Sequence, residues 1–257
     1  MSRPKVTLEN YEEVYDWYAN YYQPRRATKL AYSVLNRRFN PEVHYEPGAL
    51  DEFSDFRRSD TPQIFALNHL TNTVDQFVAS SFAYQAVPED VGRTRVMAKD
   101  ELFRKSYRRF IDLMGAIPTY RMKDHAQMEG GEELVRQSND MLIDTCGIIL
   151  ASGQNLGVFV EGSHNKVDPA VVQTVRSGFA RTAFNALSRG VSTMVTPVGM
   201  SFGTSLENLD PRQAVLVVGR SIPVTTEHTE DSLIASTATA LQTAVDRANE
   251  IRSTRTN

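Results

Sequence analysis

The feature that most constrains this fold is the alternation, from residue 63 onward, of short apolar runs with longer stretches of helical periodicity. We expect strands at 63–67, 95–98, 116–119, 156–160, 194–198 and 214–218. We expect helices at 74–87, 102–114, 131–152, 179–188 and 231–252. Such alternation is typical of α/β layers around parallel strands. The sequence therefore predicts an α/β fold with a mixed, largely parallel central sheet flanked by helices, preceded by an N-terminal helical segment.

Residues 1–45 differ from this pattern, and we expect them to form a separate N-terminal segment before an α/β domain at 46–257. Six aromatic residues crowd into 11–22, and a basic stretch with apolar residues at helical spacing follows at 28–39. Aromatic residues beside a basic amphipathic helix are typical of a membrane interface. They are also typical of a helix docked on its own domain, so both interpretations stay open. The prolines and acidic residues of 40–62 predict loop and sheet edge.

The composition narrows the class of protein. Apolar residues make up 41% of the 257, which suits a globular core, and the net charge of −3 argues against nucleic acid as the main partner. The single Cys146 excludes a disulfide framework, and we expect it in the core of a protein from a reducing compartment. No secretory signal or membrane-spanning run is visible. We expect a cytoplasmic protein that can lie on a membrane surface without crossing it.

The first polar block lies where the apolar run 63–67 gives way to a helical pattern. It places Asn68 and His69 at the mouth of a strand and Asp75 six residues after His69. A histidine oriented by a carboxylate is suited to act as a general base. Residues 71–73 favour a turn, which would bring the two side chains together. The alternative is a polar strand end followed by an ordinary first-turn carboxylate.

Three further blocks fall at or within predicted strands and can contribute to the same site. Arg121 ends the block that starts at Gly115, and its planar guanidinium suits a phosphate. A glycine turn rich in polar residues follows the strand at 156–160; its candidate binding residues are Glu161, Gly162, Ser163 and Lys166. An apolar run around Pro197 can line an acyl or pantetheine channel. Each block on its own also fits an ordinary structural role.

Taken in order, the four blocks resemble the glycerolipid acyltransferase family, the glycerol-3-phosphate and 1-acyl-glycerol-3-phosphate acyltransferases. The family's motifs are Asn-His followed by Asp, Gly-x-Ile-x-x-x-Arg, Phe-Pro-Glu-Gly-Thr-Arg-Ser and a Pro-Val run. The matching residues are Asn68, His69, Asp75, Gly115, Ile117, Arg121, Phe159, Glu161, Gly162, Ser163, Pro197 and Val198. The resemblance covers about residues 60–225. It departs from the family in the five residues between His69 and Asp75, where four are usual, in Val160 for proline, and in His164 for arginine.

The resemblance implies transfer of a fatty acyl group from a thioester to the hydroxyl of glycerol phosphate or lysophosphatidate, in phospholipid synthesis. His69 would be the general base and Asp75 its orienting carboxylate, while Arg121 would bind the acceptor phosphate. Glu161, Gly162 and Ser163 would shape that pocket with help from Lys166. Acyl-CoA or acyl-carrier protein would be the donor. We expect no cofactor and no metal, since the five histidines lack ligand spacing.

Two alternatives remain on the sequence alone. The acceptor can be a different alcohol, because a His–Asp base suits any hydroxyl. The chain can also be a catalytically silent lipid-binding protein on the same fold, which the longer spacing and His164 favour. The distance between His69 and Asp75 separates this second alternative from an enzyme, because a base and its carboxylate must lie within hydrogen-bond reach.

Overall fold

The computed structural model describes residues 2–203 and 205–254. Its strands are β1 (Glu42–Tyr45), β2 (Gln63–Leu67), β3 (Thr94–Lys99), β4 (Ala116–Thr119), β5 (Asn155–Phe159), β6 (Met194–Ser201), β7 (Val215–Val218) and β8 (Ile222–Pro223). Its α-helices are α1 (Tyr11–Asn20), α2 (Arg25–Phe39), α3 (Ala49–Arg58), α4 (Asp75–Ala86), α5 (Arg108–Leu113), α6 (Met122–His125), α7 (Gly131–Ala151), α8 (Gly178–Ser188) and α9 (Glu230–Ser253). Short 3-10 helices are η1 (Leu8–Asn10), η2 (Asp100–Arg104), η3 (Leu206–Asn208) and η4 (Pro211–Gln213).

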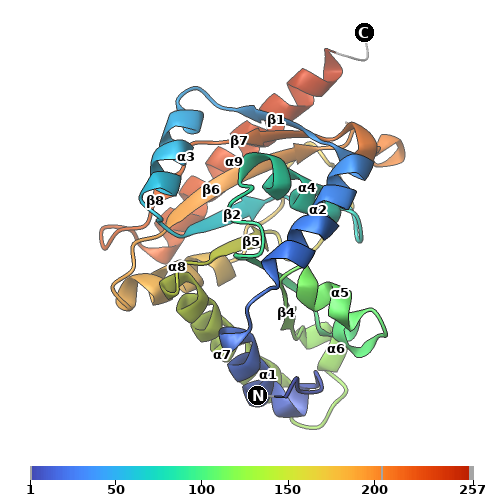
Figure 1. Cartoon of the computed structure of the whole chain (residues 1–257), viewed down its shortest axis with the longest axis vertical. Coiled ribbons are helices and arrows are strands. Elements are labelled where there is room, and N and C mark those ends of the chain that lie inside the picture. Colours follow the sequence, from blue (N-terminus) through green and yellow to red (C-terminus); the bar gives the residue numbers. More distant parts are fainter. Residues whose placement is uncertain (1, 204, 255–257) are drawn as a thin grey trace.

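The strands of the described residues form one central sheet, which Figure 1 shows running from β1 at one edge towards β4 at the other. Its order is β1-β7-β6-β2-β5-β3-β4, with β8 also paired to β6. The pairings from β6 through β2, β5 and β3 to β4 are parallel, whereas β7 and β8 run antiparallel to β6. The prediction of a mixed, largely parallel sheet flanked by helices is therefore confirmed.

Alternate residues of β2 show how the two faces of the sheet are covered. Ile64 and Ala66 belong to a core with α1, α7, α8 and α9, whereas Phe65 and Leu67 belong to a core with α3 and α4. Successive side chains of a strand point to opposite faces, so an unbroken apolar run marks a strand buried on both. β2 pairs with β5 along one edge and with β6 along the other, so its carboxyl end is fixed within the sheet.

The prediction of a single helix at 102–114 is wrong. The structure instead has η2 and α5, separated at Lys105, whose backbone is extended. Phe103 is buried, whereas Tyr107 and Phe110 are exposed, so these apolar residues do not share one buried face. A single amphipathic helix needs one continuous buried face. Two short elements with different orientations can bury Phe103 while leaving Tyr107 and Phe110 exposed.

Segment 40–62 contains more regular structure than loop and edge. β1 is an edge strand, as expected, but α3 follows it directly. Phe53 anchors α3, because its buried ring packs against Tyr45 and Phe65 at centroid distances of 6.2 and 6.1 Å. Gly48, at φ +79°, makes the turn between β1 and α3.

The N-terminal helices differ in their exposure. Tyr15 and Tyr18 of α1 are fully buried, and their hydroxyls donate to the Pro118 carbonyl (3.0 Å) and to Asp112 (2.6 Å). α1 is thus docked on the domain. α2 packs beside α4, as Figure 1 shows, but leaves Leu30 and Val34 exposed. Of the helices in the described part of the chain, none combines the length and the apolar content needed to span a membrane.

Candidate active site

The carboxyl end of β2 is fixed by a side-chain clamp. The Asn68 amide donates to the Met200 carbonyl (3.0 Å) and accepts from the Met200 N–H (2.7 Å). Both groups of this buried amide are therefore bound to the backbone of β6. The clamp stops β2 at a defined point and sets the direction in which the next residue, His69, leaves the sheet.

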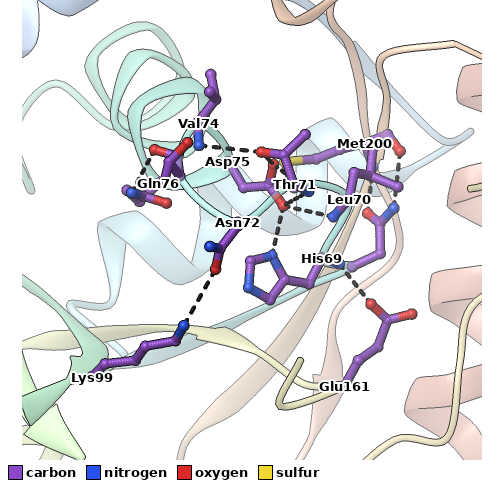
Figure 2. A network of polar contacts seen from close by, with 12 residues as sticks. His69, Leu70, Thr71, Asn72, Val74, Asp75, Gln76, Lys99, Glu161 and Met200 are labelled. Carbon is purple, nitrogen blue, oxygen red and sulfur yellow. Dashed lines mark hydrogen bonds and ion pairs between the residues drawn. The ribbon is translucent and has the colours of Figure 1, made fainter. Parts of the chain in front are cut away.

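His69 and Asp75 are joined directly. His69 Nδ1 lies 2.7 Å from Asp75 Oδ2, and Asp75 is the fully buried first residue of α4. The same carboxylate accepts the backbone N–H groups of Leu70 (2.6 Å) and Thr71 (3.0 Å). Figure 2 shows the turn wrapped around this carboxylate. The five-residue spacing thus closes into a hydrogen-bonded pair.

The partners of Asp75 fix the tautomer of His69. An ionised carboxylate only accepts hydrogen bonds, so His69 Nδ1 carries the proton and donates it. Nε2 is then the basic nitrogen, and the His69 side chain retains 18% exposure beside a cavity. A histidine held in this way can remove a proton from a bound hydroxyl.

The loop after β5 holds the backbone of His69. The Glu161 carboxylate accepts the N–H of His69 (2.7 Å) with one oxygen and the N–H of Gln173 (2.6 Å) with the other. The His69 carbonyl accepts from the N–H of Asn165 (2.6 Å), and Phe159 stacks on the imidazole at 4.6 Å. Burial raises the pKa of Glu161, although these hydrogen bonds oppose the shift.

His164 stands at the rim of the same pair. Its ring lies edge-on to His69, with centroids 6.0 Å apart. Burial lowers the pKa of His164 below its ordinary value, and the positive charge that His69 can carry lowers it further. Ser163 and Lys166 of the same loop are exposed, and Gly162 makes the turn at φ +70°.

Arg121 also reaches this region. It follows β4 and precedes α6, where its guanidinium pairs with Asp124 at 2.5–2.6 Å. It lines the same cavity as His69 and Gly162. Lys99, at the end of β3, lines the cavity as well, and its ammonium donates to Asn72 (3.3 Å).

Two residues expected at the site lie elsewhere. Gly115 precedes β4, at the strand end opposite Arg121, and a Cβ there would lie 2.5 Å from the Thr94 carbonyl. Pro197 is buried within β6, in register with Ala66. Neither lines the cavity beside His69, and neither do Asn68, Glu161, Ser163 or Lys166, which instead lie on the segments that follow β2 and β5. The structure therefore gives Gly115 and Pro197 a place in the framework of the sheet.

The cavity has a volume of about 540 Å³ and runs along β3 beneath α4 and α5. His69, Lys99 and Arg121 stand at its polar end, whereas Tyr32 and Met114 stand at its apolar end. Its remaining walls are mostly apolar side chains. This size and lining are typical of sites that enclose a small, largely apolar ligand.

Sequence reasoning missed Lys99 and Thr71 as site residues. Lys99 ends a strand adjacent to β5, a position that favours a site residue in an open parallel sheet. The sequence predicts Thr71 only as part of a turn, yet its hydroxyl donates to Asp75 Oδ1 (2.5 Å). No group of three or more His, Cys, Asp or Glu within residues 2–203 and 205–254 is arranged to hold a metal ion.

Comparisons with known proteins show the family and the fold of this chain. A family model described as Acyltransferase matches residues 51–201, which is more than half of the chain. The structure is similar to that of PlsC, the 1-acyl-sn-glycerophosphate (LPA) acyltransferase from Thermotoga maritima, with a TM-score of 0.50. The two are 13% identical, and the match covers 93% of this chain and 94% of that one, so the similarity is one of fold. A search of the curated proteins found no match.

Proposed function

The chain belongs to the acyltransferase family, and we propose that it transfers a fatty acyl group from a thioester to the hydroxyl of glycerol phosphate or lysophosphatidate, in phospholipid synthesis. The observation that carries this proposal is the 2.7 Å contact between His69 and Asp75 at the polar end of an apolar cavity. The contact supplies a base, and the cavity has room for an acyl chain. A silent lipid-binding protein has no need for the first of these.

In the proposed reaction, His69 Nε2 accepts the proton of the acceptor hydroxyl as the oxygen attacks the thioester carbonyl. The tetrahedral intermediate then collapses, the C–S bond breaks, and the imidazolium returns its proton to the departing thiolate. Asp75 stabilises the imidazolium while it exists. A positioned base of this kind contributes about 10²–10⁴ in rate, and orientation of the two substrates contributes further.

We assign the acyl chain to the cavity along β3. From Thr94 to Lys99 the strand rises about 17 Å, at about 3.3 Å per residue. An extended alkyl chain advances about 1.27 Å per carbon, given its bond length and tetrahedral angle, so roughly 13 carbons fit this length. Tyr32 and Met114 line the far end and belong to one small apolar cluster. The cavity therefore favours long-chain donors, carried by coenzyme A or by an acyl-carrier protein.

We assign the acceptor phosphate to the basic groups around His69. Arg121 and Lys99 line the cavity, and Lys166 stands on the neighbouring loop. A guanidinium can bind two phosphate oxygens at once, which makes Arg121 the principal ligand in this proposal. Asn68 and Glu161 support the site through the backbone, because their polar atoms already bind Met200, His69 and Gln173.

We also propose that α2 rests on a membrane surface. Leu30 and Val34 are 68% and 55% exposed and lie one turn apart on its outer face. The helix carries five basic residues and no acidic one. Exposed apolar side chains between basic ones suit an interface with anionic lipids. Tyr107 and Phe110, which line the cavity, are also exposed, at 42% and 37%.

The test is a thiol-release assay with acyl-CoA and a panel of acceptors: glycerol 3-phosphate, lysophosphatidate and uncharged alcohols. We expect release to require a phosphorylated acceptor and to disappear in a folded His69→Ala variant. Arg121→Ala should raise the KM for the acceptor more than the KM for the donor. Unchanged turnover in His69→Ala would refute the mechanism, and release with every alcohol would refute the acceptor.

A further inference from the structure

The turn between β2 and α4 contains one hydroxyl that reaches the buried carboxylate. Thr71 Oγ1 donates to Asp75 Oδ1 (2.5 Å) and accepts from the N–H of Val74 (3.1 Å). The backbone N–H of Thr71 lies 3.0 Å from both oxygens of Asp75. Thr71 therefore touches the carboxylate at two points and the start of α4 at a third, as Figure 2 shows.

The two oxygens of Asp75 are held differently. Oδ2 accepts from His69 Nδ1 and the N–H of Leu70, Oδ1 accepts from the Thr71 hydroxyl, and the N–H of Thr71 lies 3.0 Å from both oxygens. The terminal torsion of an aspartate is broad, so a carboxylate can turn about its Cβ–Cγ bond unless both oxygens are bound. The Thr71 hydroxyl makes the shorter contact to Oδ1, at 2.5 Å against 3.0 Å for the N–H, and so helps to fix the direction from which Oδ2 meets the imidazole.

The same hydroxyl also bridges the turn formed by the five residues between His69 and Asp75. It has one donor and two acceptor sites, and one bond of each kind is made within the turn. Its bond from Val74, which precedes the first residue of α4, ties the turn to the helix start. The turn and the carboxylate are therefore oriented by the same atom.

We propose that Thr71 is a positioning residue for the general base, acting on His69 through the carboxylate of Asp75. The proposal rests on the proposed function, since it assigns Thr71 a part in the same proton transfer. Thr71 does not line the cavity and touches no substrate in this scheme. Its effect comes through alignment, where a displacement of about 1 Å can cost about 10²-fold in rate.

Other titratable groups surround the pair and must be kept constant in the test. Glu161 and His164 lie on the loop after β5, together with Lys166, and Lys99 ends β3. None of them contacts the Thr71 hydroxyl. A change confined to that hydroxyl therefore leaves their hydrogen bonds in place.

The experiment compares Thr71→Val, which keeps the shape without the hydroxyl, with Thr71→Ser, which keeps the hydroxyl. We expect Thr71→Val to lower kcat by about 10- to 100-fold with little change in either KM, and Thr71→Ser to restore most of it. The acidic limb of the kcat/KM profile should move to higher pH in Thr71→Val. The reason is that losing a hydrogen bond to the carboxylate makes a proton on the His–Asp pair more favourable.

The matched control is Thr193→Val. The Thr193 hydroxyl is buried and has no hydrogen-bond partner among the described residues, and Thr193 lies just before β6, at the strand's amino end. This variant should keep the turnover of the unchanged protein. Thr71→Ala is a second variant should Thr71→Val not fold, as judged by thermal melting. Equal kcat and equal pH profiles in the unchanged protein and the folded Thr71 variants would overturn the proposal.

His69→Ala separates this proposal from the proposed function. If His69→Ala retains full turnover, the general-base mechanism fails whatever Thr71 does. If His69→Ala is inactive while Thr71→Val turns over normally, only the positioning role fails. Loss in both variants, with recovery in Thr71→Ser, supports the two together.

Discussion

Replacing Asp75 by asparagine tests the pair at the centre of the site with little change in volume. In one orientation, the amide oxygen takes the place of Oδ2 and still accepts from His69 Nδ1 and the N–H of Leu70. In the other, the amide nitrogen faces these two donors and leaves the Leu70 N–H buried without an acceptor, at a cost of about 1–3 kcal/mol. We therefore expect the first orientation, which preserves the tautomer of His69, removes the negative charge and places the amide –NH₂ where Oδ1 accepted the Thr71 hydroxyl.

The expected loss of rate follows from that charge. An imidazolium and a carboxylate whose charge centres lie about 4 Å apart attract by about 4 kcal/mol at an effective dielectric constant of about 20. Losing this attraction when the imidazolium forms corresponds to a decrease of roughly 10³ in rate. The hydrogen bonds to the neutral amide are also weaker than those to the carboxylate. We expect a loss of stability of about 1–3 kcal/mol, at about 2–4 °C in Tm for each kcal/mol.

The assay is thiol release from acyl-CoA with lysophosphatidate, measured as kcat/KM on protein shown to be folded at the assay temperature. Asp112→Asn is the matched control, because Asp112 is a buried carboxylate bonded to Tyr18 that makes no contact with His69 and is not among the residues lining the cavity. It should lose stability while the folded fraction keeps its rate. If folded Asp75→Asn retains kcat/KM within about threefold of the unchanged protein, the carboxylate does not support a general base.

Three further predictions address the surface, the cavity and the loop. Substituting glutamine for both Leu30 and Val34 should weaken binding to phosphatidylglycerol vesicles by about 2 kcal/mol, or roughly 30-fold, in a sedimentation assay. The control Ile148→Gln on α7 should leave binding unchanged, and equal binding by both variants would contradict the α2 contact. Ala83→Leu should shift the preferred acyl-CoA to shorter chains in a competition assay, because Ala83 lines the cavity and packs against the cluster of Tyr32 and Met114. An unchanged preference would place the chain elsewhere. His164→Gln should reduce the fall in Tm between about pH 7 and about pH 5.5. The lowered pKa of His164 means that the unfolded chain takes up a proton at this residue more readily than the folded protein, so acidification favours unfolding. An identical fall in Tm would argue against this linkage.

The sequence predicted the sheet well because its strands are short apolar runs buried on both faces. Each of the six expected strands is present with bounds shifted by a few residues at most, and the pairing of His69 with Asp75 was foreseeable because both lie in one short turn. The break at Lys105 was not foreseeable from spacing. It depends on which of Phe103 and Tyr107 the folded core has room to bury.

The roles of the other site residues depend on contacts between distant segments. Glu161 was expected to shape the acceptor pocket, yet both its oxygens bind backbone N–H groups. Gly115 and Pro197 matched the family pattern, although their places in the sheet are structural. The cavity itself could not be predicted, because its walls come from several helices and strands whose side chains meet only in the folded chain.

The clamps around His69 have a consequence for the order of folding. Asn68 is bound to a residue 132 positions later, and the N–H of His69 to a carboxylate 92 positions later. Contacts that close such long loops cost chain entropy before they stabilise anything, and proteins rich in them fold slowly. The imidazole can reach its working position only after β2, β5 and β6 have joined. Recovery of acyl transfer during refolding should therefore follow the return of helical structure, which makes enzyme activity a late reporter of the completed sheet.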